Sequence, residues 1–355
     1  MNLIGSNAKL IGDSFTGWGK PAIVRVPLTD IVFSGMIRND ALLVIYKSTD
    51  AGLTWAEDYV FTAYTPVRNF CIIAGELGNM YLAFNYANNV ISVQKRLAST
   101  GVWSEKLTFT TAAYVPTGYT LPGLLYNSNN GYIYCAYCYN VGSDGTLAVR
   151  FSANYGTTWS SVATYGQHAG GNVGELVLRG MDIYPIAPSL NSVCYLWGST
   201  QNQLYVRYVS SLYNCTSLVL GFQVSLAGIP YASSMVVDGL GNVWTAVAST
   251  GASTAGQVDV RKNNVASLNF ITGTNNVLGV NQGSIDLATD GSNNIYLFYQ
   301  MTVAPQIAYY RKYDSGTLTW GVETSITSGE GSRIASEKRT IPGSTQLHLI
   351  YYTSV

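Results

Sequence analysis

Four arginines stand at positions from which they could bind one anionic ligand. They are Arg25, Arg68, Arg179 and Arg339, and each lies at or just before a short apolar segment. A guanidinium presents planar, paired donors that match a carboxylate or a sulfate. If the apolar segments surround one opening, we expect these side chains to attract an acidic ligand there. Solvated or ion-paired loop arginines are the alternative.

Residues for acid–base chemistry are scarce in comparison. The candidates are Asp40, which follows Arg38 by two positions, Glu175, which precedes Arg179 by four, and Tyr119. A general acid must lie within hydrogen-bond reach of the substrate and have a pKa suited to its task. The sequence does not single out the pair of carboxylates that most glycosidases use. Binding without catalysis is therefore the preferred prediction.

A second set of arginines keeps the phase of an internal repeat. The set is Arg150, Arg207, Arg261 and Arg311, which recur at intervals of about fifty residues. A residue placed by a repeat is expected to serve the fold, so we predict a structural role for all four. The two histidines, His168 and His348, stand alone and give no metal-ligand pattern. We expect neither a metal nor a cofactor.

The repeat itself determines the expected elements. A turn and an aromatic strand recur about every fifty residues, as in GNMYLAF (78–84), GYIYCAY (131–137), GNVWTAV (241–247) and NNIYLFY (293–299). Each copy also has a short apolar strand before the turn, and an alternating strand and a loop after it. Four short strands per repeat, with apolar residues at every second position, are typical of a β-propeller blade.

The number of copies predicts the number of blades. Short apolar first strands are expected at residues 22–27, 69–75, 121–127, 181–187, 233–239, 284–290 and 338–344. They predict one all-β domain over residues 1–355, a single propeller of seven four-stranded blades, with six blades as the alternative. The last blade stops after its second strand, so we expect residues 1–20 to supply its outer strands. That pairing of the two chain ends would close the ring and cover an exposed strand edge.

Composition excludes several classes of protein. Only 11% of the 355 residues are charged and the formal net charge is zero, so nucleic-acid binding through phosphates is not expected. No segment reaches the run of about 18 apolar residues that a membrane-spanning helix needs, and the first residues do not read as a signal peptide. The five cysteines are expected to be buried free thiols. We predict a location at a virion surface or outside the cell, with the cytoplasm as the alternative.

One loop carries a recognisable family pattern. Ser48, Asp50, Gly52 and Trp55 fit the Asp-box S-x-D-x-G-x-x-W, and the chain thereby resembles the sialidase (BNR-repeat) superfamily. Further copies contain Ser152, Asn154, Gly156 and Trp159, and then Asp314, Gly316 and Trp320 without the leading serine. In that family the box is structural, so the resemblance implies a folding role. Its serine and aspartate bond backbone groups, and its glycine allows an unusual φ.

The resemblance also suggests an activity. Arg25-Val26-Pro27 matches the Arg-Ile-Pro-like motif whose arginine, in family sialidases, helps to hold the substrate carboxylate. The rest of that family's site has no clear counterpart here, and its sialidases have six blades. We therefore expect a non-catalytic binding or structural propeller that recognises a glycan or a partner protein, as a phage virion surface or tail component would. A sialidase-like hydrolase acting on acidic sugars and an intracellular protein-interaction scaffold are the two alternatives.

Overall fold

The computed structural model describes most of the chain. It covers residues 21–38, 40–86, 90–110, 122–128, 130–141, 144–165, 177–187, 190–198, 203–209, 218–225, 230–249, 258–262, 268–269, 285–300, 308–326, 333–336, 338 and 349–352. Within these ranges the chain forms antiparallel β-sheets and one short 3-10 helix, η1 (Glu76–Gly78). In the same ranges no helix is long and apolar enough to cross a membrane.

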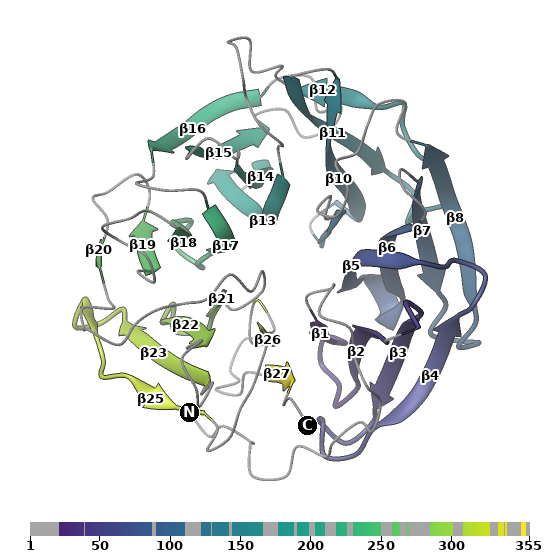
Figure 1. Cartoon of the computed structure of the whole chain (residues 1–355), viewed down its shortest axis with the longest axis horizontal. Helices are drawn as coiled ribbons and strands as arrows, with labels where there is room; N and C mark the ends of the chain where they lie inside the picture. Colours follow the sequence, from purple (N-terminus) through teal and green to yellow (C-terminus); the bar gives the residue numbers. More distant parts are fainter. Residues whose placement is uncertain are drawn as a thin grey trace.

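Each sheet is a blade whose strands follow one another along the chain (Figure 1). Blade one comprises β1 (Ala22–Arg25), β2 (Val32–Ile37), β3 (Leu43–Ser48) and β4 (Ala56–Phe61). Blade two comprises β5 (Val67–Ala74), β6 (Met80–Tyr86), β7 (Val90–Arg96) and β8 (Trp103–Thr110). Blade three comprises β9 (Gly123–Asn127), β10 (Tyr132–Val141), β11 (Asp144–Ser152) and β12 (Ala163–Tyr165).

The remaining sheets continue this order. Blade four comprises β13 (Val177–Ala187), β14 (Leu190–Gly198), β15 (Gln203–Val209) and β16 (Leu218–Ser225). Blade five comprises β17 (Pro230–Val237), β18 (Val243–Ser249), β19 (Val258–Lys262) and β20 (Leu268–Asn269). Blade six comprises β21 (Ile285–Thr289), β22 (Ile295–Gln300), β23 (Ala308–Asp314), β24 (Thr319–Trp320) and β25 (Thr324–Ser325). The terminal sheet comprises β26 (Arg333–Ser336) and β27 (Leu349–Tyr352).

The blades stand in a ring around a common axis (Figure 1). β1 packs against β5, while β26 packs against β21 and β1, so the terminal sheet lies between blade six and blade one. The structure confirms an all-β fold and a single propeller. Five sheets have four strands, one has five and one has two. Residues 1–20, which we expected to complete the last blade, lie outside the described residues.

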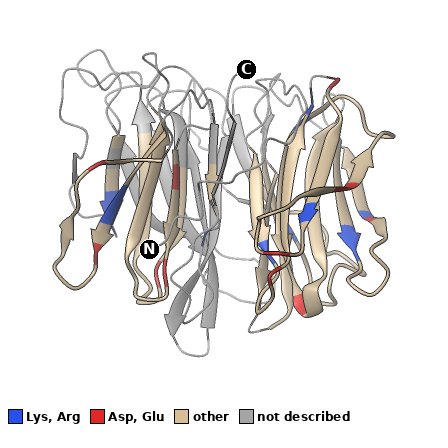
Figure 2. Cartoon of the chain, turned by 90° about the horizontal axis from the view of Figure 1, so that it is seen from below, with Lys and Arg blue, Asp and Glu red and all other residues tan. Residues whose placement is uncertain are grey.

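The connections between strands lie on two opposite faces of the ring (Figure 2). Because successive strands are antiparallel, the first-to-second and third-to-fourth connections share one face. We call it the turn face; its described segments are 26–31, 49–55, 75–79, 97–102, 128, 130–131, 153–159, 238–242, 290–294 and 315–318. Residues 160–162 are not included, because Ser160 already pairs with Phe151 of β11. The second-to-third connections and the crossings between blades lie on the other face, which we call the crossover face.

The first strand of the terminal sheet differs from the prediction. The repeat predicts this strand at residues 338–344, whereas the structure has β26 in its place and a bend at Lys338. The predicted segment contains Pro342-Gly343, a pair that favours a turn because proline cannot donate to a ladder and glycine weakens a strand. β26 provides the paired strand instead, with Ala335 buried. Residues 339–344 of the predicted strand lie outside the described residues, so its position stays a prediction.

Neighbouring blades pack face to face through apolar side chains. Side chains alternate between the two faces of a strand, so each middle strand serves two interfaces. Phe33 of blade one and Phe70 and Leu82 of blade two belong to one buried cluster. Tyr81, next to Leu82, packs instead with blade-three residues such as Ile133. Full burial of side chains of this size stabilises the fold by about 1.5–3 kcal/mol each.

An aspartate fixes the turn between the first and second strands of two blades. In blade six, Asp290 accepts hydrogen bonds from the backbone N–H of Asn294 (3.0 Å), from its side-chain amide (2.9 Å) and from the Tyr296 hydroxyl (3.0 Å). In blade five, Asp238 accepts the indole N–H of Trp244 at 2.9 Å in the matching place. The turn is thus tied to the first aromatic residue of the strand that follows. This contact explains why the two are equally spaced in both repeats.

A buried ion pair joins blade one to blade two. Asp58 accepts two hydrogen bonds from the Arg96 guanidinium, at 2.8 and 2.9 Å, and both side chains are 8% exposed. The Trp103 indole N–H donates to the same carboxylate (3.3 Å), and the guanidinium lies over the Phe33 ring, 5.0 Å from its centroid. Charges removed from water need such complete pairing. The pair therefore fixes two separate sheets against each other.

A polar tie connects the innermost strands of blade five, blade six and the terminal sheet. Buried Asp286 accepts the Ser234 hydroxyl (2.6 Å) and both the N–H (2.8 Å) and the hydroxyl (3.0 Å) of Ser336. The Lys338 ammonium donates to Asp286, to Ser234 (2.7 Å) and to the Leu287 carbonyl (3.3 Å). Hydrogen bonds to charged groups are the stronger kind. They hold β26 in its place beside β21.

Two aspartate–arginine pairs allow a matched test of burial. Asp58→Asn leaves the Arg96 charge buried without a counter-ion, and we expect the free energy of unfolding to fall by about 3–5 kcal/mol. Asp40→Asn breaks an exposed pair with Arg38 at a similar distance of 2.7 Å, and the loss should be at most about 1 kcal/mol. Denaturant unfolding of the two variants measures the difference. Equal losses would contradict the importance assigned to burial.

Candidate functional site

The first Asp-box-like loop is a hydrogen-bonded turn between β3 and β4. The Ser48 hydroxyl donates to Asp50 (2.7 Å) and accepts the Gly52 N–H (2.8 Å). Asp50 also accepts the N–H (2.9 Å) and the hydroxyl (2.6 Å) of Thr54, and the Trp55 indole donates to the Gly52 carbonyl (3.0 Å). Gly52 has a φ of 90°, a conformation that favours glycine. These contacts are internal to the loop and support a folding role.

The second loop repeats this geometry with a neutral side chain. The Ser152 hydroxyl donates to Asn154 Oδ1 (3.0 Å) and accepts the Gly156 N–H (2.8 Å), and Asn154 Oδ1 accepts the Thr158 N–H (2.8 Å). The Asn154 amide donates to the Thr158 hydroxyl (2.8 Å), which reverses the direction of that bond in the first loop. Trp159 packs against the apolar cluster of blades two and three. A charge is therefore not required for this turn.

The third loop is built differently. Asp314 accepts the N–H groups of Gly316 (2.9 Å) and Thr317 (3.0 Å), and the positive φ falls on Leu318 (58°) rather than on the glycine. This loop has no leading serine and one more residue before its tryptophan, so the bonding of the first two loops cannot form. Trp320 still packs against the apolar cluster of blades five and six. The likeness extends to the tryptophan but not to the hydrogen bonds.

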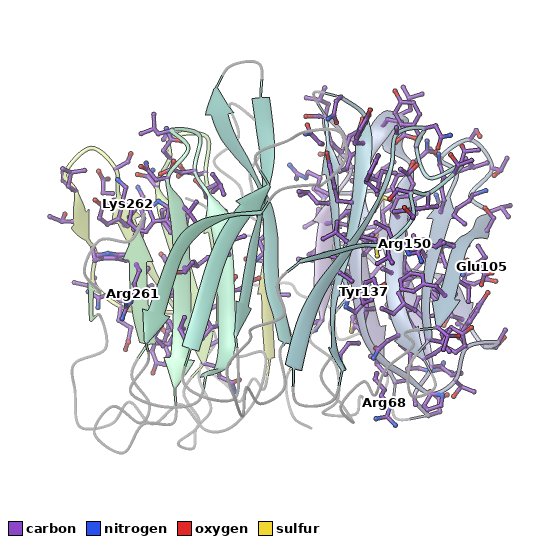
Figure 3. The ribbon with its side chains drawn as sticks, turned by 90° about the horizontal axis from the view of Figure 1, so that it is seen from above. Arg68, Glu105, Tyr137, Arg150, Arg261 and Lys262 are labelled. Carbon is purple, nitrogen blue, oxygen red and sulfur yellow. The ribbon has the colours of Figure 1, made fainter. Side chains whose placement is uncertain are left out.

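Two of the predicted ligand-binding arginines lie toward opposite faces of the ring. Arg25 is the last residue of β1, and the residue after it lies beside Gly78 on the turn face. Arg68 is the second residue of β5, and the residue before it donates to the Ala41 carbonyl on the crossover face. Figure 3 shows Arg68 at the lower end of its blade. The structure does not bring these two side chains to one opening, because neighbouring first strands run in the same direction.

Of the remaining predicted site residues, the structure describes Asp40 and the backbone of Arg179. Arg179 lies in β13, of which the structure describes the backbone, and Arg339, Tyr119 and Glu175 lie outside the described residues. Asp40 is exposed, and its carboxylate accepts two hydrogen bonds from Arg38, at 2.7 and 3.3 Å. Those bonds lower the pKa of Asp40, whereas a general acid in glycoside hydrolysis needs a raised pKa. The catalytic role of Asp40 stays a prediction, and the direction of this pKa shift does not favour it.

One position of the repeat places a polar residue in several interfaces between blades. On the third strand of blades two, three, five and six, this residue pairs with the one that follows the aromatic residue of the repeat. The residues at this interface position are Gln94, Arg150, Arg261 and Arg311, opposite Leu82, Cys135, Thr245 and Leu297. Arg207, which spacing alone places in the same series, pairs with the aromatic Tyr195 itself. It is therefore one position out of register with the other three arginines.

Arg150 packs on an aromatic pair between blades two and three. Its guanidinium lies over the Phe109 ring of β8, 4.9 Å from the centroid, and Phe109 contacts Tyr137 of β10 with 4.9 Å between ring centroids. Arg150 also donates to the Ser160 carbonyl (3.0 Å). Figure 3 shows Arg150 and Tyr137 midway along the blade, away from both faces of the ring. A guanidinium stacked in this way can still use in-plane N–H groups to bind an acceptor.

Arg311 is combined with two tyrosines and a glutamate between blades five and six. Its Nε donates to the Gly321 carbonyl (3.0 Å). Tyr299 stacks on Tyr309, with 6.0 Å between ring centroids, and donates a short hydrogen bond to Glu323. Burial raises the pKa of Tyr299, and the bond to Glu323 raises it further, so the phenol stays protonated at neutral pH. The cluster offers an aromatic face, a fixed cation and a carboxylate.

Gln94 takes the place of the arginine between blades one and two. Its amide donates to the Ser92 hydroxyl (2.7 Å) and to the Tyr64 hydroxyl (3.3 Å). Tyr64 donates in turn to Glu105 of β8 (3.0 Å), and its ring packs edge-on against Tyr86, 5.0 Å away. Burial raises the pKa of Tyr64. A planar donor, a phenol and a glutamate therefore meet in this interface too.

These three groups of residues, which we call the interface clusters, suit noncovalent binding. Each combines aromatic faces with a planar side-chain donor, and two of them add a carboxylate acceptor. Nucleophilic chemistry by Cys135, which lies opposite Arg150, is disfavoured because burial raises its thiol pKa to about 12. Across the part of the chain that the structure describes, no group of three His, Cys, Asp or Glu residues could hold a metal ion.

Sequence reasoning assigned the arginines of the interface clusters to the fold, because they keep the phase of the repeat. That role stays a prediction, and it does not exclude a second one, because a ligand site can be repeated along with the blade that carries it. The pairing between strands reveals the position that the spacing of arginines does not. Gln94 pairs with Leu82, the residue after the aromatic Tyr81, and so occupies the same position as the arginines.

No family model matches the chain, and no curated protein matches it by sequence. Solved structures match its fold. An ulvan lyase, a polysaccharide lyase, has a TM-score of 0.61 and 11% identity over 95% of this chain and 92% of its own. A six-bladed lectin from Aleuria aurantia, described by its fucose recognition, has a TM-score of 0.57 and 12% identity over 89% and 98%. AofleA from Arthrobotrys oligospora has 0.56 and 11% over 96% and 92%. Identities this low show the propeller fold alone.

The first loop predicts a measurable titration. Hydrogen bonds from Thr54 and then Ser48 lower the pKa of Asp50 to about 2. Because the folded pKa lies below the ordinary value of 3.8, these bonds stabilise the loop above that value and are lost as the pH falls through about 2. Thr54→Val removes the hydroxyl, so the pKa of Asp50 should rise toward 3.8. An NMR titration of the Asp50 carboxyl carbon tests this, and an unchanged midpoint would contradict it.

Proposed function

We propose that the protein is a non-catalytic, glycan-binding propeller and that the interface clusters hold the sugar. The observation that carries this proposal is the recurrence of one arrangement between successive blades. A planar donor at the interface position lies beside a group of aromatic rings in all three clusters, and each group contains a tyrosine. Glu105 and Glu323 add a carboxylate in two of them. Repetition of an uncommon combination of side chains favours a repeated ligand site over chance.

A sugar ring fits the chemistry of these clusters. A pyranose has C–H groups on its faces and hydroxyls around its edge. Aromatic rings can pack on the C–H face, while fixed donors and acceptors pair with the hydroxyls. Where the interface position is Arg150 or Arg311, the guanidinium can also bind a carboxylate or sulfate on the sugar. We therefore expect acidic glycans to be preferred at those two clusters.

The structural neighbours agree with this class of ligand. One is a lectin described by its recognition of fucose, and the ulvan lyase has been solved with the acidic saccharide -[GlcA(1-4)Rha3S]-. Their descriptions apply to those proteins. They support a carbohydrate as the class of ligand to test here, because a shared fold offers comparable interfaces between blades.

Binding is preferred over hydrolysis for two reasons. The carboxylate of Asp40 is paired with Arg38, and Arg25 and Arg68 lie toward opposite faces. A sialidase-like hydrolase remains the alternative and is supported by Arg25-Val26-Pro27 and by the two matching Asp-box-like loops. A phage virion component and an intracellular scaffold are further proposals, supported only by the low charge and by the thiols Cys71 and Cys135, which are not in disulfides.

We also propose that the ring has seven blades. The terminal sheet packs between blade six and blade one, where a seventh blade belongs. Residues 1–20 are the segment we assign to its outer strands, because a blade of two strands would leave an edge exposed.

A glycan array tests the proposed function with two outcomes scored together, retention of the protein and loss of the terminal sugar. We expect retention without cleavage. Arg150→Lys and Arg311→Lys keep the charge but lose the planar donor, so each should weaken binding by about tenfold or more. Arg68→Lys, at the crossover face, is the matched control and should bind like the wild type. Thermal unfolding of each variant separates lost binding from lost folding.

Two results would overturn the proposal. Cleavage that disappears in Arg25→Ala would establish the hydrolase instead. Glycan binding that persists unchanged in both Arg150→Lys and Arg311→Lys would place the ligand away from the interface clusters.

A further inference from the structure

Exposed apolar side chains gather on the turn face. Eight of the eleven large apolar residues that are exposed in the described part of the chain lie there: Leu28, Leu53, Leu77, Leu97, Val102, Tyr155, Leu240 and Leu318. Leu77 is 92% exposed and Leu28 is 85% exposed. Single apolar residues on a surface are ordinary, but a concentration on one face marks a site of interaction.

Hydrogen bonds and a close contact connect the turns of blades one and two on the turn face. Within blade one the Ala51 N–H donates to the Asp30 carbonyl (2.9 Å), which links its two turns. Within blade two the Ala98 N–H donates to Asn79 (2.9 Å) in the same way. Gly78 lies beside Val26, so the turns of these two blades also touch. The turns of blades one and two therefore form one connected part of the turn face.

Folding alone does not explain these residues. Leu28, Leu77, Tyr155 and Leu318 have φ values of 60°, 51°, 56° and 58°, where glycine or asparagine is favoured. Leu28, Leu77 and Leu318 are also 67–92% exposed, so their side chains add little packing within this chain. Large apolar residues at such positions are better explained by a contact with another molecule than by folding.

The charges on the turn face are mainly negative. Asp30 is exposed, Asp50 remains ionised because its pKa is about 2, and Asp314 also has a lowered pKa, owing to hydrogen bonds from backbone N–H groups. Lys95 and Lys312, which reach the same face, are paired with Glu76 (3.1 Å) and Asp314 (3.5 Å), and Lys262, at the end of β19, lies over the Trp244 ring at 5.3 Å from its centroid. Acidic positions can be followed along the turns at the lower end of the blades in Figure 2.

We propose that the turn face is a docking surface for a protein partner that presents apolar side chains among lysines and arginines. The apolar residues would bury against the partner, and the carboxylates would pair with its cations. A second copy of the same face is a poor match, because it would oppose carboxylate to carboxylate. This surface is separate from the interface clusters, which lie between the blades. The protein could therefore hold a glycan and this partner at the same time.

Two peptides and two variants test the proposal. The probe is a fluorescent amphipathic peptide of leucine and lysine, and its control is the same peptide with glutamate in place of lysine. The wild type should bind the lysine peptide at least tenfold more tightly than the glutamate peptide, and salt should weaken the binding. The double variant Leu28→Gly and Leu77→Gly removes two exposed side chains at left-handed positions. It should lose at least tenfold in affinity while its melting temperature stays the same or rises, because glycine suits that conformation.

The matched control is Val322→Gly, because Val322 is 83% exposed but lies outside the turn face, between β24 and β25. It should bind the lysine peptide like the wild type. Equal affinity for both peptides, no measurable affinity for either, or unchanged binding by the double variant would overturn the proposal. Retention on phosphatidylcholine vesicles would assign the face to a membrane instead. A dimer that only the double variant dissociates, measured by sedimentation, would assign it to a second copy.

Discussion

The whole ring depends on the packing of each blade between two neighbours. Every middle strand turns alternate side chains toward the preceding and the following blade, as Leu82 and Tyr81 do. Both faces of a sheet must therefore be apolar near the axis, which leaves few places for polar groups. The buried ion pair between Arg96 and Asp58 shows how charges can enter an interface when they are paired. The interface clusters are built around the interface position of the third strands, which in blade two is Gln94, two residues before Arg96.

The fold was predictable from sequence because its signals are periodic. The aromatic strands, the turns rich in glycine and aspartate and the alternating third strands all recur, and each corresponds to an element of the blades. The paired strand Arg333–Ser336 was not predicted, because the repeat pattern favoured the apolar segment at 338–344, most of which lies outside the described residues. The ion pair between Asp58 and Arg96 could not be foreseen, because partners on different blades have no fixed spacing.

The candidate site was less predictable for a physical reason. Strand register decides which face a residue occupies, and a shift of one position reverses it. Arg207 has nearly the spacing of Arg150 and Arg261, yet it pairs one position away from their place in the ladder. Arg25 and Arg68 likewise do not meet, because one lies at the end of its strand and the other near the start. The spacing of residues in the sequence gives only their approximate place in a blade, and the pairing between strands gives the exact one.

The place of β26 between β21 and β1 bears on how the chain reaches its native state. Among the described sheets blade one is synthesised first, and the terminal sheet that packs against it is synthesised after all the others. Until the terminal sheet is made, the apolar face of blade one that packs against it is exposed, and such a surface is prone to aggregation. Contacts between the first and last strands are also the most distant in sequence, so they should form late. The hydrogen bonds from Lys338 and Ser336 to Asp286 should therefore be among the last to form, when the terminal sheet packs against blade six.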